Sequence, residues 1–134
     1  MAKVKNKRIM VDMSATLIHH GHIRLLKAAK ELGDVIVALT TDDEIKNKKG
    51  YIPELNFSQR KEILEAIRYV DEVVPSEWLL TELFLQKHSI DWLVHGSDNF
   101  NNISRKKLKI LPRTEGISSS MIRKKAKDIC NLSI

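Results

Sequence analysis

The chain has 134 residues and a mass of 15.4 kDa, with 43% hydrophobic and 30% charged residues, a composition typical of one globular domain over residues 1–134. Cys130 is the only cysteine, which excludes a disulfide framework and favours a cytoplasmic location. No apolar stretch approaches the roughly 20 residues that span a bilayer, so we expect no membrane insertion. The 23 Lys and Arg residues exceed the 17 Asp and Glu residues, and the resulting charge of +6 favours an anionic partner.

Short apolar runs alternate with amphipathic runs along the whole chain. The runs predict strands over residues 8–11, 35–39, 72–74, 92–94 and 108–111. They are continuously apolar rather than alternating, which is typical of parallel strands buried on both faces. Because amphipathic segments separate them, the chain predicts a single Rossmann-like α/β domain, a five-stranded parallel sheet with helices on both faces.

Four helices are predicted between and after these strands. The first includes Leu25 and Leu32 and ends at Gly33 as a C′ residue, and the second covers residues 63–70 with Ser58 as its N-cap. The other two are predicted over residues 79–87 and 118–127. Residues 41–56 are predicted to form a long mobile loop. In a sheet of this kind ligands bind beyond the carboxyl ends of the strands, so the segments that follow strands are the informative ones.

The turn after the first strand contains His19, Gly21 and His22 at the start of a helix. A helix N-terminus attracts phosphate, and each imidazole adds a donor that can stabilise developing phosphoryl charge. Gly21 lets the backbone approach a ligand closely. A surface histidine cluster or a chance metal site is the alternative interpretation.

Two further turns carry ligand-binding side-chain types. Arg113 offers a forked donor for phosphate, and Ser118 and Ser119 open a second helix N-terminus, so two such termini at one crevice favour a polyphosphate cradle. A plain N-cap is the alternative there. Gly96 and Asp98 follow the fourth strand and suit a ligand rim, with an Asx-type turn as the alternative.

Basic side chains could complete the site. Lys46, Lys48 and Lys49 lie in the predicted loop and could close over a phosphate as a lid, or could simply be solvated. Arg60 and Arg68 are predicted on the second helix, where either could reach the crevice. Arg68 lies among apolar residues and is expected to be the less exposed of the two, which would require an anionic partner.

Several motifs together resemble the HxGH-type cytidylyltransferases, and most of all the glycerol-3-phosphate cytidylyltransferases. The similarity is carried by His19-His20-Gly21-His22, by residues 113–119 (RTEGISS) and by residues 63–73, and it covers nearly the whole chain. It implies attack of an acceptor phosphate on the α-phosphorus of CTP, release of pyrophosphate, a requirement for Mg²⁺ and a homodimer. The resemblance assigns catalysis to His19, His22, Lys46, Lys48, Lys49 and Arg113. Acceptor binding is expected at Arg60, Arg68 and Lys49, and the resemblance matches Arg68 and Lys49, but not Arg60, to basic residues of the family. The expected nucleotide-binding residues are Ser14, Ala15, Gly21, Gly96, Asp98, Arg113, Thr114, Gly116, Ile117, Ser118 and Ser119.

The chain departs from that family in two places. Met13-Ser14-Ala15-Thr16 stands where the family usually has GTFD, and residues 96–99 (GSDN) replace GDDW. Residues 11–22 instead resemble the cytidylyltransferases of phosphonate pathways, so the acceptor could be a phosphonate such as 2-aminoethylphosphonate. An adenylyltransferase that uses ATP is another alternative. A non-catalytic nucleic-acid-binding module, suggested by the net charge and the basic run at 105–109, is the least favoured, so no nucleic-acid partner is expected.

Overall fold

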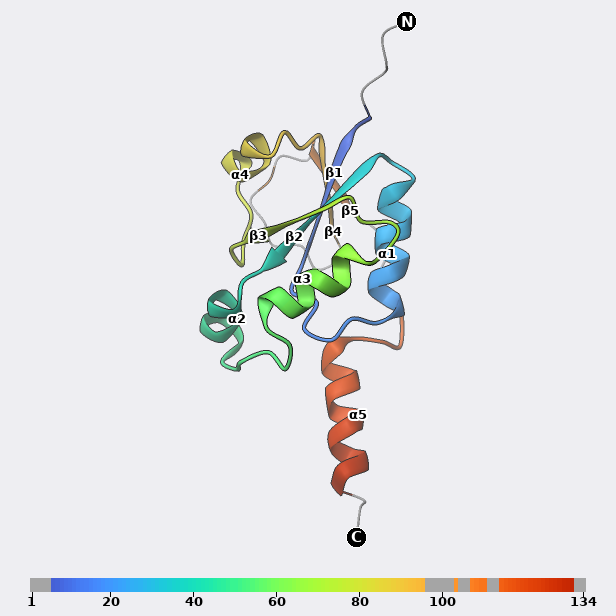
Figure 1. Ribbon diagram of the computed structural model, residues 1–134, viewed down its shortest axis with the longest axis vertical. Helices are drawn as coiled ribbons and strands as arrows, with labels where there is room; N and C mark the ends of the chain where they lie inside the picture. Colours follow the sequence, from blue (N-terminus) through green and yellow to red (C-terminus); the bar gives the residue numbers. More distant parts are fainter. Residues whose placement is uncertain (1–5, 96–102, 104–106, 111–113, 132–134) are drawn as a thin grey trace, which may run out of the picture.

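Five strands run parallel in one sheet, in the spatial order β3-β2-β1-β4-β5 (Figure 1). They are β1 (Arg8–Met13), β2 (Asp34–Thr40), β3 (Glu72–Ser76), β4 (Trp92–His95) and β5 (Leu108–Ile110). The computed structural model describes residues 6–95, 103, 107–110 and 114–131. All five predicted strands are confirmed. The chain runs from β1 outward to β3 and then returns to the other side of β1, so the switch point of the sheet lies between β1 and β4.

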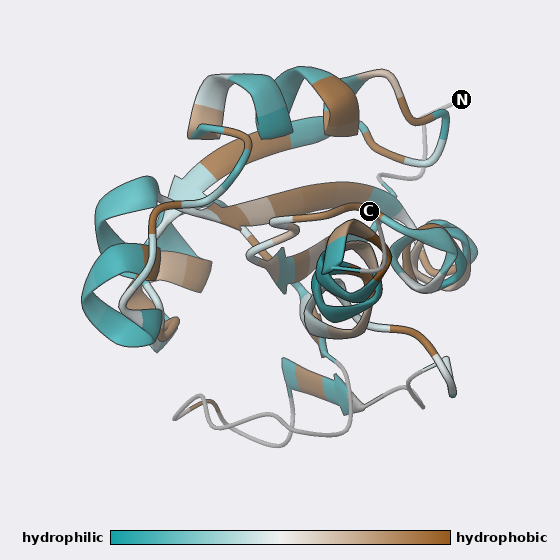
Figure 2. Cartoon of the chain, turned by 90° about the horizontal axis from the view of Figure 1, so that it is seen from below, coloured by the Kyte–Doolittle hydropathy of each residue, from teal (hydrophilic) through white to brown (hydrophobic). Residues whose placement is uncertain are grey.

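Helices cover both faces of the sheet, as predicted. On one face Val11, Val37 and other fully buried strand residues pack with Leu26 of α1 (His20–Lys30) and Leu64 of α3 (Phe57–Glu65). On the other face, strand residues pack with Leu85 of α4 (Glu82–Lys87). Figure 2 shows the apolar strands as brown ribbons between helices whose surfaces are largely teal. Burial on both faces explains why the strands are continuously apolar.

The expectation of a loop over residues 41–56 is wrong, because α2 (Asp42–Lys49) lies within it. Thr41 is the N-cap and its Oγ1 accepts a hydrogen bond from Glu44 N at 3.4 Å. Gly50 ends the helix with a φ of 77°. Apolar periodicity does not reveal this helix, because Ile45 is its one buried residue. The acidic first turn, the basic last turn and the final glycine favour the helix instead.

Other helix boundaries also differ from the predictions. Asn56 rather than Ser58 caps α3, with its Oδ1 accepting from Gln59 N at 2.9 Å, and α3 ends at Glu65. The predicted helix over residues 79–87 begins only at 82, after the N-cap Thr81.

The prediction that Gly33 ends the first helix as its C′ residue is wrong. Gly33 does not have a positive φ, and α1 already ends at Lys30. A Cβ on Gly33 would lie 2.2 Å from Lys7 O, so glycine is required here because another part of the backbone approaches so closely.

The last helix, α5 (Ser119–Asn131), starts at the carboxyl edge of the sheet and extends away from it (Figure 1). None of its described side chains is buried, and Met121 and Ile129 are 51% and 59% exposed. Among residues 6–95, 103, 107–110 and 114–131, no helix is long and apolar enough to cross a membrane.

Candidate active site

The turn between β1 and α1 ends in a cap that consists of two imidazoles. His19 is the N-cap of α1, and its Nδ1 accepts a hydrogen bond from Gly21 N at 3.1 Å. His22 completes the cap, because its Nδ1 accepts from His19 N at the same distance, 3.1 Å. The two ring centroids lie 4.0 Å apart. Histidine thus performs here the capping function that Ser, Thr or Asn and Glu or Gln usually perform.

This cap determines which ring nitrogen carries the proton. A nitrogen that accepts an N–H cannot itself be protonated, so the neutral rings of His19 and His22 carry their protons on Nε2. Two Nε2–H donors therefore accompany the positive dipole end of α1, where the Gly21 and His22 amides are already bonded within the cap. That combination suits an anion with several oxygens, such as a triphosphate.

The second predicted turn contacts the first. Ser119, the first residue of α5, donates from Oγ to Leu17 O at 2.8 Å and accepts from Leu17 N at 3.3 Å. A Cβ on Gly21 would lie 3.3 Å from Cγ2 of Ile117, so those two residues are also in close proximity. Two helix N-termini therefore lie together at the carboxyl edge, as the sequence predicts.

Within this second turn the residues play different structural parts. Gly116 has a φ of 77°, which favours glycine, and Thr114 is half-buried. Ser118 accepts from Met121 N at 3.1 Å, so the plain N-cap interpretation holds for its hydroxyl. Gly96, Asp98 and Arg113, which the sequence also assigns to the site, lie outside the described residues.

The first turn contains a backbone conformation that is costly for its residue type. Ala15 has a φ of 47° and is 2% exposed, although the left-handed region costs a residue with a Cβ roughly 1–2 kcal/mol. The preceding Ser14 carbonyl accepts a hydrogen bond of 2.6 Å from Nη1 of Arg60. The surrounding contacts thus hold the turn in place.

A partly buried carboxylate–imidazole pair lies at the switch point itself. Asp12 of β1 and Nδ1 of His95, at the end of β4, form this pair, and their side chains are only 12% and 18% exposed. The sequence analysis singled out neither residue as part of the site. A carboxylate inside the apolar run of β1 was the signal for Asp12, because a buried charge requires a partner.

The three candidate lysines lie on α2, directly after β2 and therefore at the carboxyl edge. All three are exposed, and Nζ of Lys49 lies 5.6 Å from the centroid of the Trp78 ring. Among the residues that the structure describes, neither Lys46 nor Lys48 has such a ring contact. The lysines therefore lie on an ordered helix rather than on a mobile loop.

The two candidate arginines exchange their expected environments. Arg60 is fully buried and is hydrogen-bonded to backbone carbonyls and to Asp42, so its guanidinium is not open to an acceptor. Arg68 is exposed and donates to Tyr69 Oη at 2.9 Å. It follows the end of α3 and precedes β3, at the amino edge of the sheet, so the structure does not bring Arg68 to the crevice. The error arose because local apolar neighbours were taken as a sign of burial.

Arg123 is a contact that the sequence analysis missed. From α5 its Nε and Nη2 bind the Glu54 carboxylate at 2.5 and 2.7 Å, and Nη2 also lies 3.4 Å from Oγ1 of the buried Thr16. The hydrogen bond from Arg123 lowers the pKa of Glu54, against the opposing effect of burial. Arg123 also lies over the Tyr51 ring, 4.7 Å from its centroid. This side chain joins α5, the α2–α3 connection and the β1–α1 turn.

Comparison with known proteins agrees with this geometry. The family profile described as Cytidylyltransferase-like matches residues 14–125. The glycerol-3-phosphate cytidylyltransferase of Staphylococcus aureus is 42% identical over 125 residues, which cover 87% of this chain and 92% of that protein. The ethanolamine-phosphate cytidylyltransferase of Dictyostelium discoideum is 34% identical over 90% of this chain, but only 37% of that protein is covered. The FAD synthase of Thermococcus kodakarensis is 37% identical over 90% of this chain and 81% of that protein.

A solved structure shares the fold. The lipopolysaccharide core biosynthesis protein from Thermoplasma volcanium GSS1 has a TM-score of 0.63, and the match covers 92% of this chain and 88% of that chain at 19% identity. Together with the profile match and the relative that is 42% identical, the two converging turns lead to one conclusion. The chain belongs to the cytidylyltransferase-like family of nucleotidyltransferases.

Proposed function

We propose that this protein transfers CMP from CTP to a small phosphorylated alcohol, with glycerol 3-phosphate as the first candidate, and releases pyrophosphate. The observation that carries the proposal is the contact of Ser119, the first residue of α5, with Leu17 in the β1–α1 turn, beside the cap formed by His19 and His22. The relative that is 42% identical over 87% of the chain supports the choice of nucleotide and acceptor.

In this reaction an oxygen of the acceptor phosphate forms a bond to the α-phosphorus of CTP. The bond from that phosphorus to the oxygen bridging to the β-phosphate breaks, and the electron pair leaves with pyrophosphate. Because the acceptor is already an anion, no strong general base is needed, and catalysis depends on positioning and charge stabilisation. In our proposal the Nε2–H groups of His19 and His22 donate to the triphosphate as negative charge develops on the leaving group. Lys46 and Lys48 add positive charge from the α2 side.

Mg²⁺ is the proposed cofactor, and it would neutralise part of the triphosphate charge. Among the described residues no group of three or more His, Cys, Asp and Glu side chains is placed to hold a metal. Mg²⁺ commonly keeps several waters and binds through substrate phosphates with only one or two carboxylates. In our proposal the triphosphate therefore carries most of the contacts to the ion.

A homodimer is the proposed assembly, and a cytoplasmic location stays a prediction from the single cysteine. The apolar side chains that α5 exposes, Met121 and Ile129, support self-association. Sedimentation analysis of wild type and of a Met121→Lys variant tests this, because a dimer that uses this surface should dissociate in the variant. A wild type that sediments as a monomer would contradict the proposal.

The decisive experiment measures pyrophosphate release with Mg²⁺, with CTP or ATP, and with a panel of acceptors. The panel contains glycerol 3-phosphate, ethanolamine phosphate and 2-aminoethylphosphonate. We expect turnover with CTP and glycerol 3-phosphate above all other pairs. Preference for ethanolamine phosphate or the phosphonate would redirect the acceptor assignment, and preference for ATP would redirect the nucleotide. Absence of turnover with every pair would remove the proposed function.

Two conservative variants separate catalysis from capping at His22. Asparagine can present an acceptor near the position of Nδ1, so His22→Asn preserves the bond from His19 N but lacks the distal N–H. Glutamine can present a donor near the position of Nε2. We expect His22→Asn to lower kcat by about 100-fold or more, and His22→Gln to retain more activity. The reverse order of activities would show that the cap, and not Nε2, is what the reaction needs.

A further inference from the structure

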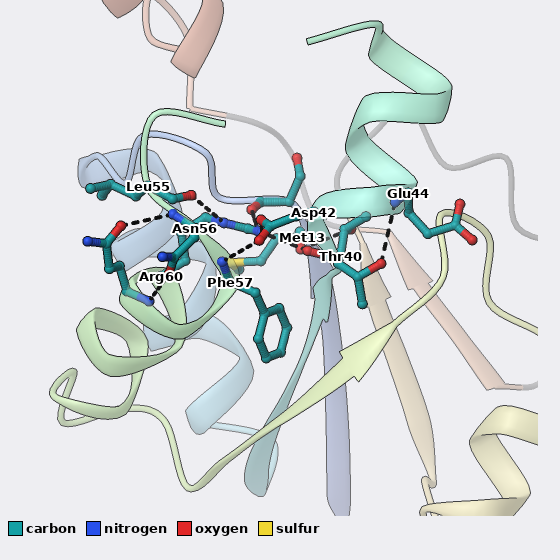
Figure 3. Close-up of polar contacts among 11 residues, drawn as sticks. Met13, Thr40, Asp42, Glu44, Leu55, Asn56, Phe57 and Arg60 are labelled. Atoms are coloured by element: carbon teal, nitrogen blue, oxygen red, sulfur yellow. Dashed lines mark hydrogen bonds and ion pairs between the residues drawn. The ribbon is translucent and has the colours of Figure 1, made fainter. Parts of the chain in front are cut away.

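Arg60 connects three separate segments of the chain although its guanidinium never reaches the surface. The side chain is 0% exposed. Its Nε donates to Leu55 O at 3.1 Å, and its Nη1 donates to Ser14 O at 2.6 Å and to Thr40 O at 2.9 Å. Its Nη2 donates to Oδ1 of Asp42 at 2.6 Å. Figure 3 shows this arrangement, with Asp42 and Leu55 on either side of the arginine.

A buried arginine is an inefficient way to gain stability. Taking a guanidinium out of water costs several kcal/mol in general, and apolar side chains of similar volume often replace buried ionic groups without loss. The partner carboxylate of Asp42 stays 38% exposed, so it compensates only part of this cost. What apolar side chains cannot do is hold three carbonyl groups and one carboxylate in fixed directions. The planar donor fork of arginine does this. The contacts of Arg60 therefore point to a function in geometry.

One hydrogen bond of Arg60 supports the turn that leads to the imidazole cap. Nη1 of Arg60 binds the Ser14 carbonyl, which belongs to the peptide group immediately before Ala15. Ala15 has a positive φ of 47°, so the orientation of that peptide group is the one that needs external support. Four residues later the chain reaches His19, the N-cap of α1.

Another hydrogen bond of Arg60, to Asp42, anchors the helix that carries the lysines. Asp42 is the first residue of α2, and while its Oδ1 binds Arg60, its Oδ2 accepts from Phe57 N at 3.0 Å. The carboxylate thus ties the start of α2 to the start of α3. Apart from this anchor, Ile45 is the one buried side chain of α2.

We propose that Arg60 and Asp42 are a positioning pair that sets the spacing between the imidazole turn and the lysine helix, the two sides of the triphosphate site. Neither residue touches substrate; Asp42 acts through Lys46 and Lys48 on α2, and Arg60 acts through Asp42 and through the Ser14 carbonyl. The inference rests on the proposed function in one respect, because the triphosphate between the turn and the helix is the ligand that this function requires.

The test compares Asp42→Asn with Asp43→Asn, a matched control in the same first turn of α2. Asp43 is exposed and makes no ion pair among the described residues, so the control removes the same charge next to the same helix N-terminus. We expect Asp42→Asn to lower kcat at least tenfold while the KM for the acceptor stays near wild type, and Asp43→Asn to stay within twofold. Equal losses in the two variants would overturn the proposal.

A second comparison shows whether Asp42 acts through the lysines. In a background where Lys46 and Lys48 are both alanine, Asp42→Asn should lower kcat by no more than about twofold further. A defect that merely destabilises the fold would instead multiply the loss by the same factor in both backgrounds, and this result would refute a positioning function.

Hydrogen exchange supplies a readout that does not depend on activity. In Asp42→Asn the amides of residues 45–49 should exchange at least tenfold faster than in Asp43→Asn, while β1 and β4 exchange at wild-type rates. Unchanged exchange in α2 would overturn the inference even if the enzyme is active. Conversely, a wild type without turnover would remove the proposed function, and the exchange data would still decide whether the pair positions α2.

Discussion

Adding one methyl group at Gly21 is expected to disable the site while leaving the fold intact. The new Cβ would lie 2.8 Å from Cε1 and 2.9 Å from Nδ1 of His19, and 3.3 Å from Cγ2 of Ile117. Ordinary contacts begin near 3.4 Å, so the His19 ring must move by about half an ångström or more and release the hydrogen bond from residue 21 N. Misplacement on this scale costs roughly 100-fold in rate when the displaced group acts on the reacting centre.

Stability should change little in Gly21→Ala because two effects oppose each other. Alanine within a helix gains up to about 1 kcal/mol over glycine. Loss of an N-cap hydrogen bond costs about 1 kcal/mol. The melting temperature should therefore stay within a few degrees of wild type, while pyrophosphate release from CTP falls by about 100-fold.

Gly33→Ala is the matched control and should behave in the opposite way. Its Cβ would lie 2.2 Å from Lys7 O, which is also the acceptor for Asp34 N at 2.8 Å, so backbone must shift. Overpacking of this kind costs about 1–3 kcal/mol. For 134 residues at about 2.1 cal/mol/K each, this corresponds to a melting temperature lower by about 4–10 °C. If Gly21→Ala retained activity within tenfold, or if both variants lost activity equally, the assignment of the cap to the site would be refuted.

Three further outcomes are expected from the same structure. Burial alone would raise the pKa of Asp71, but hydrogen bonds from Lys30 Nζ and Val35 N lower it below its ordinary value. The ionised Asp71 carboxylate therefore stabilises the fold above its unfolded-state pKa of about 4, and this stabilisation is lost as the pH falls through the lower folded-state pKa. In urea unfolding, Asp71→Asn should be less stable than wild type at pH 7, and the difference should shrink progressively below pH ~4. Ile45→Ala removes the fully buried side chain of α2 and should cost about 2 kcal/mol or more in urea unfolding, whereas Lys48→Ala should cost less than about 0.5. Chelation of divalent cations should abolish pyrophosphate release, with recovery on addition of Mg²⁺; undiminished turnover in EDTA would contradict the proposed cofactor.

The sheet was predictable because its physics is local along each strand. Runs such as Val35–Leu39 must be apolar at every position when both faces are covered, and β2 with its neighbours shows this burial. The α2 helix was missed for the converse reason. Its sequence has one buried apolar residue, so periodicity is absent, although Thr41 and Gly50 are typical helix start and stop residues.

The site likewise contains a part that is local in the sequence and a part that is not. The cap formed by His19, Gly21 and His22 lies within one helical turn, so the spacing of these residues in the sequence is enough to predict that they lie together. Ser119 and Leu17 lie 102 positions apart, and only the rule that ligands bind at the carboxyl ends of strands predicts their proximity.

The burial of Arg60 and Arg68 could not be predicted from the sequence. Neighbours along the chain suggested that Arg68 is the buried arginine, but burial depends on what the rest of the fold places around a side chain. The acceptors of the Arg60 guanidinium other than Leu55 O lie 46, 20 and 18 positions away, on the β1 turn, at the end of β2 and at the start of α2. Groups expected to meet the triphosphate are therefore recognisable from short motifs, whereas groups that fix their relative positions are not. Substitutions of the first kind should change the chemical step alone, and substitutions of the second kind should change the chemical step together with the order of the helix that they anchor.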